Sequence, residues 1–394
     1  MATKLTRKKP SKPHPDFPLT ANGNGQWSKK IRGKVYYFGP WAEHQAALDR
    51  YLNVKDDLLA GRKLRWNLDD PCVVDVVNHF LTAKNALVES GELTHRSWKD
   101  YKQTCERVIE VFDRHRLIDD LGADDFLQLR EKLTEGRNPV SLGNEIQRVR
   151  TLFKYAYDAE LIDRPVRFGP TFKRPGKKVR RRLRNDQGPK LFAAEEVRAM
   201  LETDSLQLRA MILLAINCGF GNTDCATLPR TRLDLVAGWH RYGRPKTGVE
   251  RRCPLWVETV AALKEVAKTR PTPRDARDID LVFMTKYGNR WIRQPNAASD
   301  AWIDSVSLEF GKIVASLGIA RPGATFYSLR RTFRTVADAT RDQPAVMHIM
   351  GHADADNDMS AVYRQGIDDD RLVAVVNHVH EWLFPKKERP AKST

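Results

Sequence analysis

A stretch rich in proline, glycine and basic side chains, residues 166–190, divides this chain into two parts. It shows no apolar periodicity, whereas the segments before and after it repeat apolar residues at the spacing of helices. A chain interrupted in this way is not expected to bury one continuous core, so we predict separate folded domains before and after a basic linker. A linker that lies along a polyanion and a disordered spacer both fit this composition, and the two descriptions are not exclusive.

The segment before the linker, residues 66–165, is predicted to be a compact helical domain. Apolar spacing marks four helices, at residues 72–90, 96–115, 123–133 and 141–162. Cap residues are offered by Thr94 to Ser97 and by Ser141, and Gly136 with Pro139 separates the third helix from the fourth. The fourth helix is predicted to have an apolar face made of Ile146, Val149, Leu152, Phe153 and Ala156. Its basic residues then face outward, and these are Arg148, Arg150 and Lys154.

The first 65 residues are predicted to form a basic tail followed by a small ribbon-and-helix unit. Aromatic and basic residues alternate on either side of Gly33, which is typical of two strands joined by a glycine turn. A helix is expected to follow and to stop at Gly61. We expect about half of the aromatic side chains of this unit to form its core; the set is Trp27, Tyr36, Tyr37 and Trp41.

Residues 191–386 are predicted to form a second domain that mixes helices with short strands. Helices are expected at residues 193–203, 206–220 and 257–268, with a strand-rich section at 232–256 that turns at Lys246 to Gly248. A buried strand is expected next, at residues 280–285. It is followed by a helix whose apolar face is predicted to consist of Trp302, Val306, Phe310, Ile313 and Leu317. The fold class is therefore mainly α with small β-sheets, and residues 387–394 form a C-terminal tail.

Positive charge is concentrated in two places. The net charge is +17, and residues 1–34 together with residues 173–190 supply 16 of it. Contact with phosphates explains this concentration better than general solubility does, although solvated tails that bind nothing specific are the alternative. The candidate DNA-binding residues are Lys29, Lys30, Arg32, Arg148, Arg150, Lys154, Lys177, Lys178, Arg180, Arg181 and Arg182.

Several classes of protein are disfavoured by composition. The five cysteines form no CxxC pair and have no nearby histidine cluster, so we predict reduced core thiols and no metal site. No apolar run is long enough to span a bilayer, and the N-terminus has no apolar segment of the secretory type. We therefore expect a cytoplasmic protein associated with the nucleoid.

Residues 325–363 bring together side chains that suit a phosphodiester. Arg330, a Gly351-His352 pair and Tyr363 lie in one module with apolar residues at helical spacing between them. A guanidinium binds phosphate oxygens with two parallel hydrogen bonds, an imidazole donates a hydrogen bond, and a phenolic oxygen can attack phosphorus. The rest of the chain is then expected to bring DNA to this module.

The order of these features resembles that of the tyrosine recombinases, the phage integrase type of site-specific DNA recombinase. The segment Tyr327-Ser328-Leu329-Arg330 is similar to the family's H-x-x-R box with tyrosine in place of histidine. Gly351-His352 is similar to the Leu-Gly-His box, and Tyr363 follows it by eleven residues, a gap about two residues longer than usual, so residues 354–358 look like a small insertion. Lys246 resembles the lysine of the family's catalytic β-hairpin.

One motif departs from the family. The first family arginine belongs to a T-G-L-R-x-x-E-L box, and the similar stretch here, residues 218–225, has Gly221 at the arginine position. Asp224 keeps the acidic residue of the box, and Leu228 keeps an apolar one. Losing a guanidinium that stabilises phosphoryl charge is expected to cost several kcal/mol at the transition state, by analogy with losing an oxyanion donor. Either another cation fills the gap or catalysis is impaired, and the candidates are Arg230, Arg232 and Arg331.

The resemblance implies a recombinase that cuts and rejoins double-stranded DNA through a 3′-phosphotyrosyl link. Tyr363 would be the nucleophile, Arg330 and His352 would hold the phosphoryl oxygens, Lys246 would protonate the leaving 5′-oxygen, and Tyr327 would be a substitute hydrogen-bond donor. No metal or cofactor is implied, because the covalent link stores the bond energy. Residues 1–65 would be an arm-type DNA-binding unit, 66–165 the core-binding (SAM-like) domain and 191–386 the catalytic domain, in a homo-tetramer on paired sites. The helix at residues 370–383 would dock on a neighbouring subunit.

Each of these residues also has an ordinary role that the sequence leaves open. Tyr363 can be a half-buried helix tyrosine, His352 a residue at a helix end, and Lys246 a solvated turn residue. An arginine inside an apolar helix needs an anionic partner, and for Arg330 a carboxylate such as Asp338 could supply it. His348 and Arg334 are expected to be structural. The alternative functions are a DNA-binding protein of recombinase descent that no longer cuts and, third, a type IB topoisomerase-like enzyme.

Overall fold

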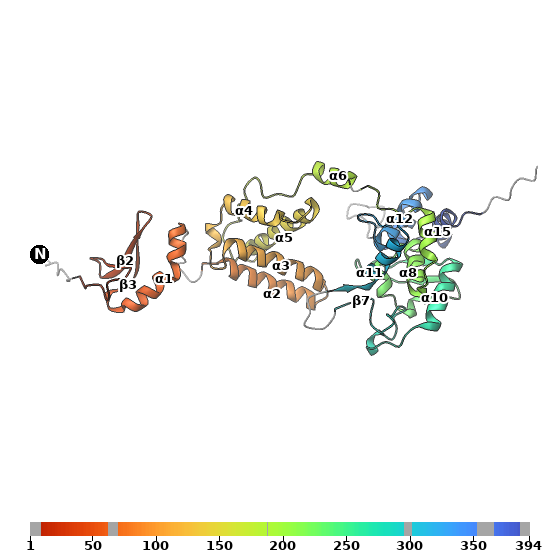
Figure 1. The fold of residues 1–394 in the computed structure, drawn as a ribbon, viewed down its shortest axis with the longest axis horizontal. Coiled ribbons are helices and arrows are strands. Elements are labelled where there is room, and N and C mark those ends of the chain that lie inside the picture. Colours follow the sequence, from red (N-terminus) through yellow and green to blue (C-terminus); the bar gives the residue numbers. More distant parts are fainter. Residues whose placement is uncertain (1–8, 62–69, 187, 295–301, 353–365, 387–394) are drawn as a thin grey trace, which may run out of the picture. The chain divides into compact units, whose positions relative to one another are not determined.

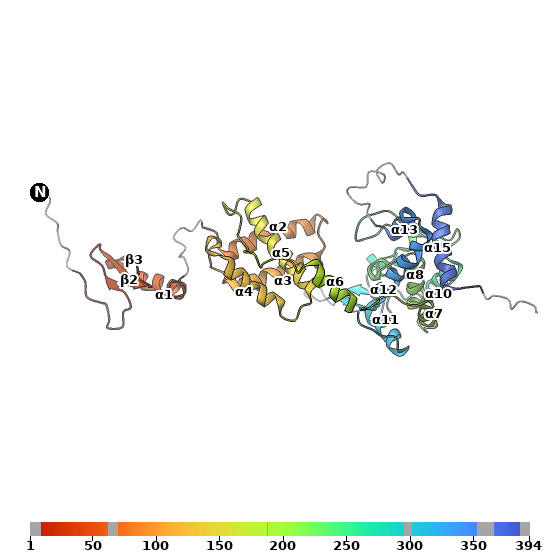
Figure 2. The ribbon, with the colours of Figure 1, turned by 90° about the horizontal axis from the view of Figure 1, so that it is seen from above.

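The computed structural model describes residues 9–61, 70–186, 188–294, 302–352 and 366–386. The chain forms two compact units, residues 1–183 and residues 184–394 (Figures 1 and 2). The boundary lies inside α6, Lys177–Asp186, a helix within the segment that we expected to lack periodic structure. Lysine and arginine are good helix formers, which explains why this basic stretch is helical despite its charge.

The N-terminal part of the first unit is a small antiparallel sheet with one helix. Strands β1 (Thr20–Ala21), β2 (Gln26–Ile31) and β3 (Lys34–Pro40) pair in that order, and α1 spans His44–Ala60. The ribbon was predicted with two strands, so β1 is an addition. Its turn has φ of 50° at Arg32 and 85° at Gly33, as a tight hairpin turn requires. Trp27 is buried, Tyr36 and Trp41 are partly buried against the same core, and Tyr37 is exposed.

The helical part of the first unit agrees with prediction. It contains α2 (Val73–Glu89), α3 (His95–Phe112), α4 (Ala123–Thr134) and α5 (Pro139–Asp158). The predicted apolar face of α5 is buried over its whole length. Asn138, not Ser141, caps α5: its side chain accepts from the backbone N–H groups of Val140 and Ser141. Pro139 is thus the first residue of the helix rather than a breaker, because the first turn needs no N–H from it.

The second unit is built around a helix that is buried on all sides. The buried helix is α8 (Leu206–Asn217), and Figures 1 and 2 show it among the other helices, with α10 and α12 packed against it. An apolar sequence without a polar face favours this central position. The remaining helices are α7 (Ala194–Leu201), α9 (Asn222–Ala226), α10 (Val257–Thr269), α11 (Ser305–Ser316), α12 (Phe326–Ala337), α13 (Gln343–Met350) and α15 (Asp369–Leu383).

Two short sheets complete the second unit. Strands β4 (Leu233–Asp234), β5 (Trp239–Arg241) and β6 (Arg252–Pro254) form an antiparallel sheet in that order. Strands β7 (Ile292–Arg293) and β8 (Ile303–Asp304) form a separate pair. The strand predicted at residues 280–285 is wrong: the segment is buried but pairs with the chain only through an isolated bridge between Leu281 and Pro229.

Two apolar stripes take different positions from those expected. In α11, Val306 and Phe310 are buried as predicted, whereas Trp302 and Leu317 lie beyond the ends of the helix and are exposed. The stripe of α15 that we expected to dock on a neighbour lies in the core of its own unit, and its members are Leu372, Val375, Val376 and Val379. This helix packs on α12 and therefore has no apolar face left for a partner. Among the described residues, no helix has the length and apolar character needed to cross a membrane.

Candidate active site

Arg330 is the centre of the candidate site. It lies on α12 and is 1% exposed, with Nη1 donating to the carbonyl of Gly219 and Nη2 donating to the carbonyl of Met350 at 2.7 Å. The carboxylate that could have explained its burial, Asp338, pairs instead with Arg334 at 3.1 Å. Burial, followed by the nearby charge of Arg244, lowers the pKa of Arg330 to about 10. The guanidinium therefore stays charged at neutral pH, and within the described residues no carboxylate is bonded to it.

Two glycines in the left-handed region position this arginine. Gly219 has φ of +63° at the end of α8, and a Cβ there would lie 3.0 Å from the ring of Phe333. Gly351 has φ of +60° at the end of α13, and a Cβ there would lie 2.8 Å from the Cβ of Arg244. Both positions therefore exclude a side chain, and their tight turns bring the carbonyls of residues 219 and 350 to Arg330.

His352 lies beside Arg330 and is neutral. Its Nε2 is 3.0 Å from Nη2 of Arg330, which can only donate, so the imidazole proton resides on Nδ1. Burial and then the charges of Arg330 and Arg244 lower the pKa of His352 to about 4. At pH 7 the ring can therefore donate one hydrogen bond from Nδ1, and it carries no charge.

The turn between β5 and β6 is held next to this histidine. The hydroxyl of Thr247 donates to the carbonyl of Gly351 at 3.0 Å, and the turn is closed by the N–H of Gly248 donating to the carbonyl of Arg244 at 2.9 Å. Lys246 precedes Thr247 and is exposed, and its ammonium has no acceptor among the residues that the structure describes. This hydrogen bond holds the turn that carries Lys246 against Gly351, the residue before His352.

Gly221 lies under the ring of Tyr327. Its N–H donates to Asp224 at 2.7 Å, and a Cβ built on it would be 3.4 Å from the ring carbons of Tyr327. Tyr327 is 39% exposed, and the guanidinium of Arg331 lies over its outer side at 5.6 Å. The side chain of residue 327 therefore takes space that a longer residue at 221 would need.

Two arginines of the hairpin were not predicted and are close to this site. Arg251 pairs with Asp224 at 3.0 Å, donates from Nε to the carbonyl of Tyr242 at 2.8 Å and stacks on Phe220, with its side chain fully buried. Arg244 is 8% exposed. A signal for Arg251 was present in the sequence, because strand alternation separates it from its partly buried neighbour Arg252, but only tertiary packing decides which of the two is fully buried.

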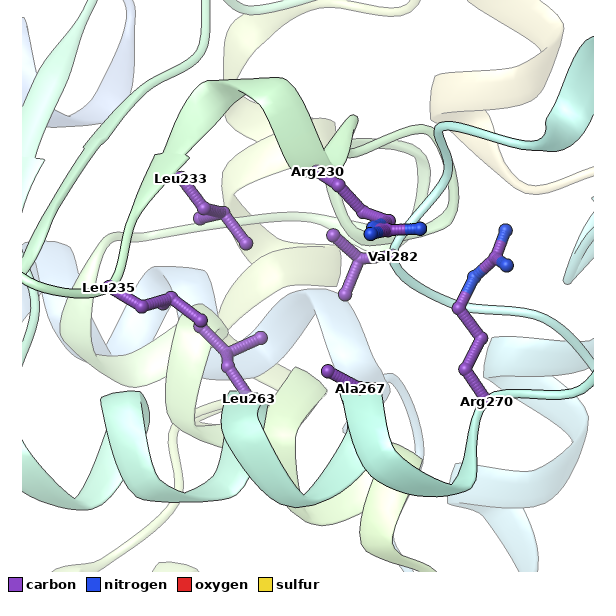
Figure 3. A pocket seen from close by; sticks show the side chains of 7 residues that line it. All are labelled: Arg230, Leu233, Leu235, Leu263, Ala267, Arg270 and Val282. Atoms are coloured by element: carbon purple, nitrogen blue, oxygen red, sulfur yellow. The ribbon is translucent and has the colours of Figure 1, made fainter.

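The cations suggested as replacements at Gly221 lie elsewhere, with one exception. Arg230 lines a separate cavity of about 440 Å³ together with Arg270, opposite a group of leucines (Figure 3). Arg232 is exposed on the same short turn. Arg331 lies over the ring of Tyr327, and the same ring lies 3.4 Å from the position of a Cβ on Gly221. Closeness to Gly221 along the sequence therefore did not predict which basic side chain lies close to Gly221 in space.

A cluster of possible metal ligands is present, although the cysteine spacing indicated none. The ligand atoms of Cys218, His240 and Cys253 all lie within 4.8 Å of one another, and all three residues are buried. Burial raises the pKa of the Cys218 thiol and lowers the pKa of His240 well below its usual value. The cluster could hold a soft ion such as zinc only after its thiols lose their protons, which burial opposes. All five cysteines are free and buried, as reduced core thiols would be.

The candidate DNA-binding residues differ in how available they are. On α5, Arg148 pairs with Asp100 at 2.6 Å, and Arg150 donates to the carbonyl of Phe172 at 3.0 Å. Both side chains are therefore already bonded within the protein. Lys154 is exposed and pairs with Asp158. In the ribbon, Lys29 donates to the carbonyl of Pro18 at 2.8 Å and Arg32 reaches the carbonyl of Leu59, while Lys30 is exposed. Of the candidates on α6, Lys177, Lys178, Arg181 and Arg182 are exposed and Arg180 is half-buried.

The predicted nucleophile cannot be placed. Tyr363 and the proposed insertion at residues 354–358 lie outside the described residues. The described chain ends at His352 on one side and resumes at Gly366 on the other, at the start of the approach to α15. The role of Tyr363 thus remains a prediction from the sequence.

Comparison with known proteins shows the same fold in two DNA-bound integrases. Residues 181–369 match the phage integrase family. A lambda integrase dimer bound to a COC′ core site superposes with a TM-score of 0.56 at 15% identity, covering 91% of this chain and 98% of that one. The Tn1549 transposon integrase in complex with a circular intermediate DNA gives 0.55 at 16% identity, covering 78% and 99%. No curated protein sequence matches the chain.

Proposed function

We propose, from the premise that residues 181–369 belong to the phage integrase (tyrosine recombinase) family acting on DNA, that this protein cuts and rejoins two DNA sites through a covalent phosphotyrosyl intermediate. The observation that carries the proposal is a buried arginine without a carboxylate. Arg330 is held by two backbone carbonyls beside a neutral histidine, and its positive charge is not neutralised by the described residues around it. A phosphodiester supplies the missing negative charge and accepts its hydrogen bonds.

The proposed chemistry assigns one role to each group. The phenolic oxygen of Tyr363 attacks the phosphorus of one strand, the bond to the 5′-oxygen breaks, and a 3′-phosphotyrosyl link forms. Arg330 and the Nδ1–H of His352 stabilise the charge that develops on the other phosphoryl oxygens. Lys246, on its anchored turn, gives a proton to the leaving 5′-oxygen. A 5′-hydroxyl from a partner strand later attacks the link and releases the tyrosine, so neither a metal nor a nucleotide is consumed.

The proposed assembly follows from the DNA-bound relatives. Lambda integrase forms a dimer on a core site and a tetramer on a Holliday junction, as its structures are described. We propose double-stranded DNA as the partner and a homo-tetramer on paired sites as the active assembly. Exposed basic residues of α6, between Lys177 and Arg182, are available to contact the phosphate backbone.

A second candidate function is a DNA-binding protein of recombinase descent that does not cut. It is favoured by Gly221, which we align with the first catalytic arginine of the family and which has no side chain to offer a phosphate. A type IB topoisomerase-like activity is a third candidate and shares the same nucleophile.

The test begins by finding a target. Duplexes that the full chain binds are selected from a random library, and a nick is then moved through the selected site to trap a covalent adduct. The wild type is expected to form the adduct, and Tyr363→Phe is the matched control because it removes a single oxygen atom.

The outcomes separate the candidates. An adduct with the wild type and none with Tyr363→Phe supports the recombinase. A duplex that shifts in a gel without any adduct indicates the binding protein, and an adduct that persists in Tyr363→Phe excludes this residue as the nucleophile. Relaxation of supercoiled plasmid without strand exchange would favour the topoisomerase.

A further inference from the structure

Gly221, directly before α9, offers no side chain to a phosphate, and a Cβ there would touch its neighbours. The ring of Tyr327 and the carboxylate of Asp224 both lie within 3.4 Å of where a Cβ would be. Asp224 is already engaged, because it accepts from the N–H of Gly221 and pairs with Arg251. A second guanidinium for a phosphate must therefore come from another element of the unit.

Arg251 cannot be that group. Its guanidinium is paired with Asp224, stacked at 4.3 Å on Phe220, and its side chain has no exposed surface. Its Nη1 has no partner among the described residues, as is also true of the Nε of Arg330, so the ion pair with Asp224 is what distinguishes Arg251. Its role is to position: the bond to the carbonyl of Tyr242 lies within the hairpin, and the ion pair with Asp224 ties the hairpin to the first turn of α9.

Arg244 has the opposite properties. It is 92% buried, and no hydrogen-bond or ion-pair acceptor for its guanidinium exists among residues 188–294, 302–352 and 366–386. Unlike Arg251, it has no guanidinium nitrogen that is sealed from solvent. Its Cβ and Cδ lie against Gly351, the residue that precedes His352. Arg244 thus combines burial, an unneutralised charge and access from solvent beside the candidate site.

The positive charge of Arg244 acts on Arg330. After burial, it does most to lower the pKa of Arg330, and it also lowers the pKa of His352. Two like charges at partly desolvated positions repel each other, so this arrangement costs free energy in the unliganded protein. An anion placed between them would relieve that cost and accept hydrogen bonds from both.

We infer that Arg244, from the hairpin, binds the non-bridging oxygens of the scissile phosphate together with Arg330 and so replaces the arginine that we align with Gly221. The inference rests on the proposed function for the identity of the phosphate as a DNA phosphodiester. It makes Arg244 a second phosphate-binding residue of the site and Arg251 the residue that positions the hairpin which carries it. The alternative source of the same anion, free inorganic phosphate, serves as a probe.

The first experiment needs no DNA target. Inorganic phosphate is titrated at constant ionic strength into the full chain carrying ¹³C-labelled histidine, and the NMR signal of His352 is followed. We expect the wild type to bind phosphate saturably. Arg244→Ala should bind it roughly 10- to 100-fold more weakly, because the variant loses charge-assisted hydrogen bonds to the phosphate. Arg277→Ala is the matched control, because Arg277 is an exposed arginine whose removal takes away the same charge. Equal affinity in Arg244→Ala and wild type, or no phosphate-dependent shift in the wild type, overturns the inference.

The second experiment measures cleavage on the nicked substrate. Arg244→Ala is expected to slow adduct formation by roughly 10²- to 10³-fold, and its affinity for the intact duplex is expected to fall by less than about tenfold, since one phosphate contact among many is lost. Arg244→Lys keeps the positive charge but cannot form two parallel hydrogen bonds to the phosphate, and it should recover part of the rate of adduct formation. Wild-type cleavage by Arg244→Ala would overturn the inference. A wild type that never forms an adduct would instead defeat the proposed function, and the phosphate titration would still decide the role of Arg244.

Discussion

Two buried arginine regions of the second unit differ in one respect, and the difference separates structure from function. Around Arg251 the charge is neutralised inside the protein, by Asp224 at 3.0 Å. Around Arg330 it is not: the partners there are two carbonyls and a neutral imidazole, and Arg244 adds a second positive charge. A neutralised region stabilises the fold, whereas we propose that the region that keeps its charge binds an anion from outside.

The largest expected effect comes from breaking the neutralised region. Asp224→Ala leaves Arg251 buried without its anion, and we expect the free energy of unfolding to fall by about 3–5 kcal/mol. Urea denaturation of the full chain measures this change. Asp275→Ala, which breaks the exposed pair with Arg277, is the control and should cost at most about 1 kcal/mol. Equal losses in the two variants would show that the Asp224 pair is not a structural centre.

The next effect is on the rate of cleavage. Arg330→Lys retains the positive charge but loses the fork that reaches two carbonyls and a phosphate, so we expect adduct formation to slow by roughly 10²- to 10³-fold. The measurement is the single-turnover rate on a nicked substrate, with thermal unfolding recorded beside it. A variant that unfolds at the wild-type temperature and still cleaves at the wild-type rate would remove Arg330 from the chemistry.

A smaller effect concerns the titration of His352. In the wild type we expect a pKa of about 4, measured from the histidine NMR signals as a function of pH. The low value means that the unfolded chain takes up this proton first, near the ordinary value of 6.5, so the contribution of His352 to stability declines as the pH falls from 6.5 towards 4. Charges that face the ring are Arg330, Arg244, Arg334 and Arg251, and removing any of them favours the protonated form.

Arg244→Ala should therefore raise the pKa of His352, while Arg277→Ala should leave it unchanged. An unchanged pKa in Arg244→Ala would mean that the two side chains do not share one electrostatic environment. That result would weaken the contrast between the two arginine regions.

The smallest effect lies on the surface, outside both regions. Lys178→Ala on α6 should weaken duplex binding slightly and reduce the slope of log Kd against log salt concentration by about one, as expected for one lost phosphate contact. Lys268→Ala is the control because this exposed lysine is paired with Glu265 on α10. If both substitutions change the slope equally, α6 has no special role in binding DNA.

Local periodicity was a good guide where one segment's own residues decide its structure. The helices of the first unit, the hairpin turn at Gly33 and α8, α10 and α12 were predicted because apolar spacing and turn residues act over a few positions. The errors arose where a distant partner decides. Residues 280–285 have the composition of a strand but form only an isolated β-bridge. The apolar stripe of α15 is buried in the core of its own unit and does not face a neighbouring subunit.

The candidate site divides in the same way. The motif residues Arg330, His352 and Lys246 were found from the sequence, because short boxes place them at fixed spacings. The neutrality of His352 and the burial and hydrogen bonds of Arg330 were not, because these depend on residues 20 to more than 100 positions away, such as the carbonyls of Met350 and Gly219.

By itself, then, the sequence determined most of the helices, and it named side chains whose chemistry suits a phosphate. The tertiary structure alone decided which arginine is neutralised and which is not. Arg244 and Arg251 are seven positions apart on one hairpin and are chemically identical. The side chains of both lie against Gly351, but only Arg251 reaches Asp224, because packing against α9 sets the dielectric and the partners of each guanidinium.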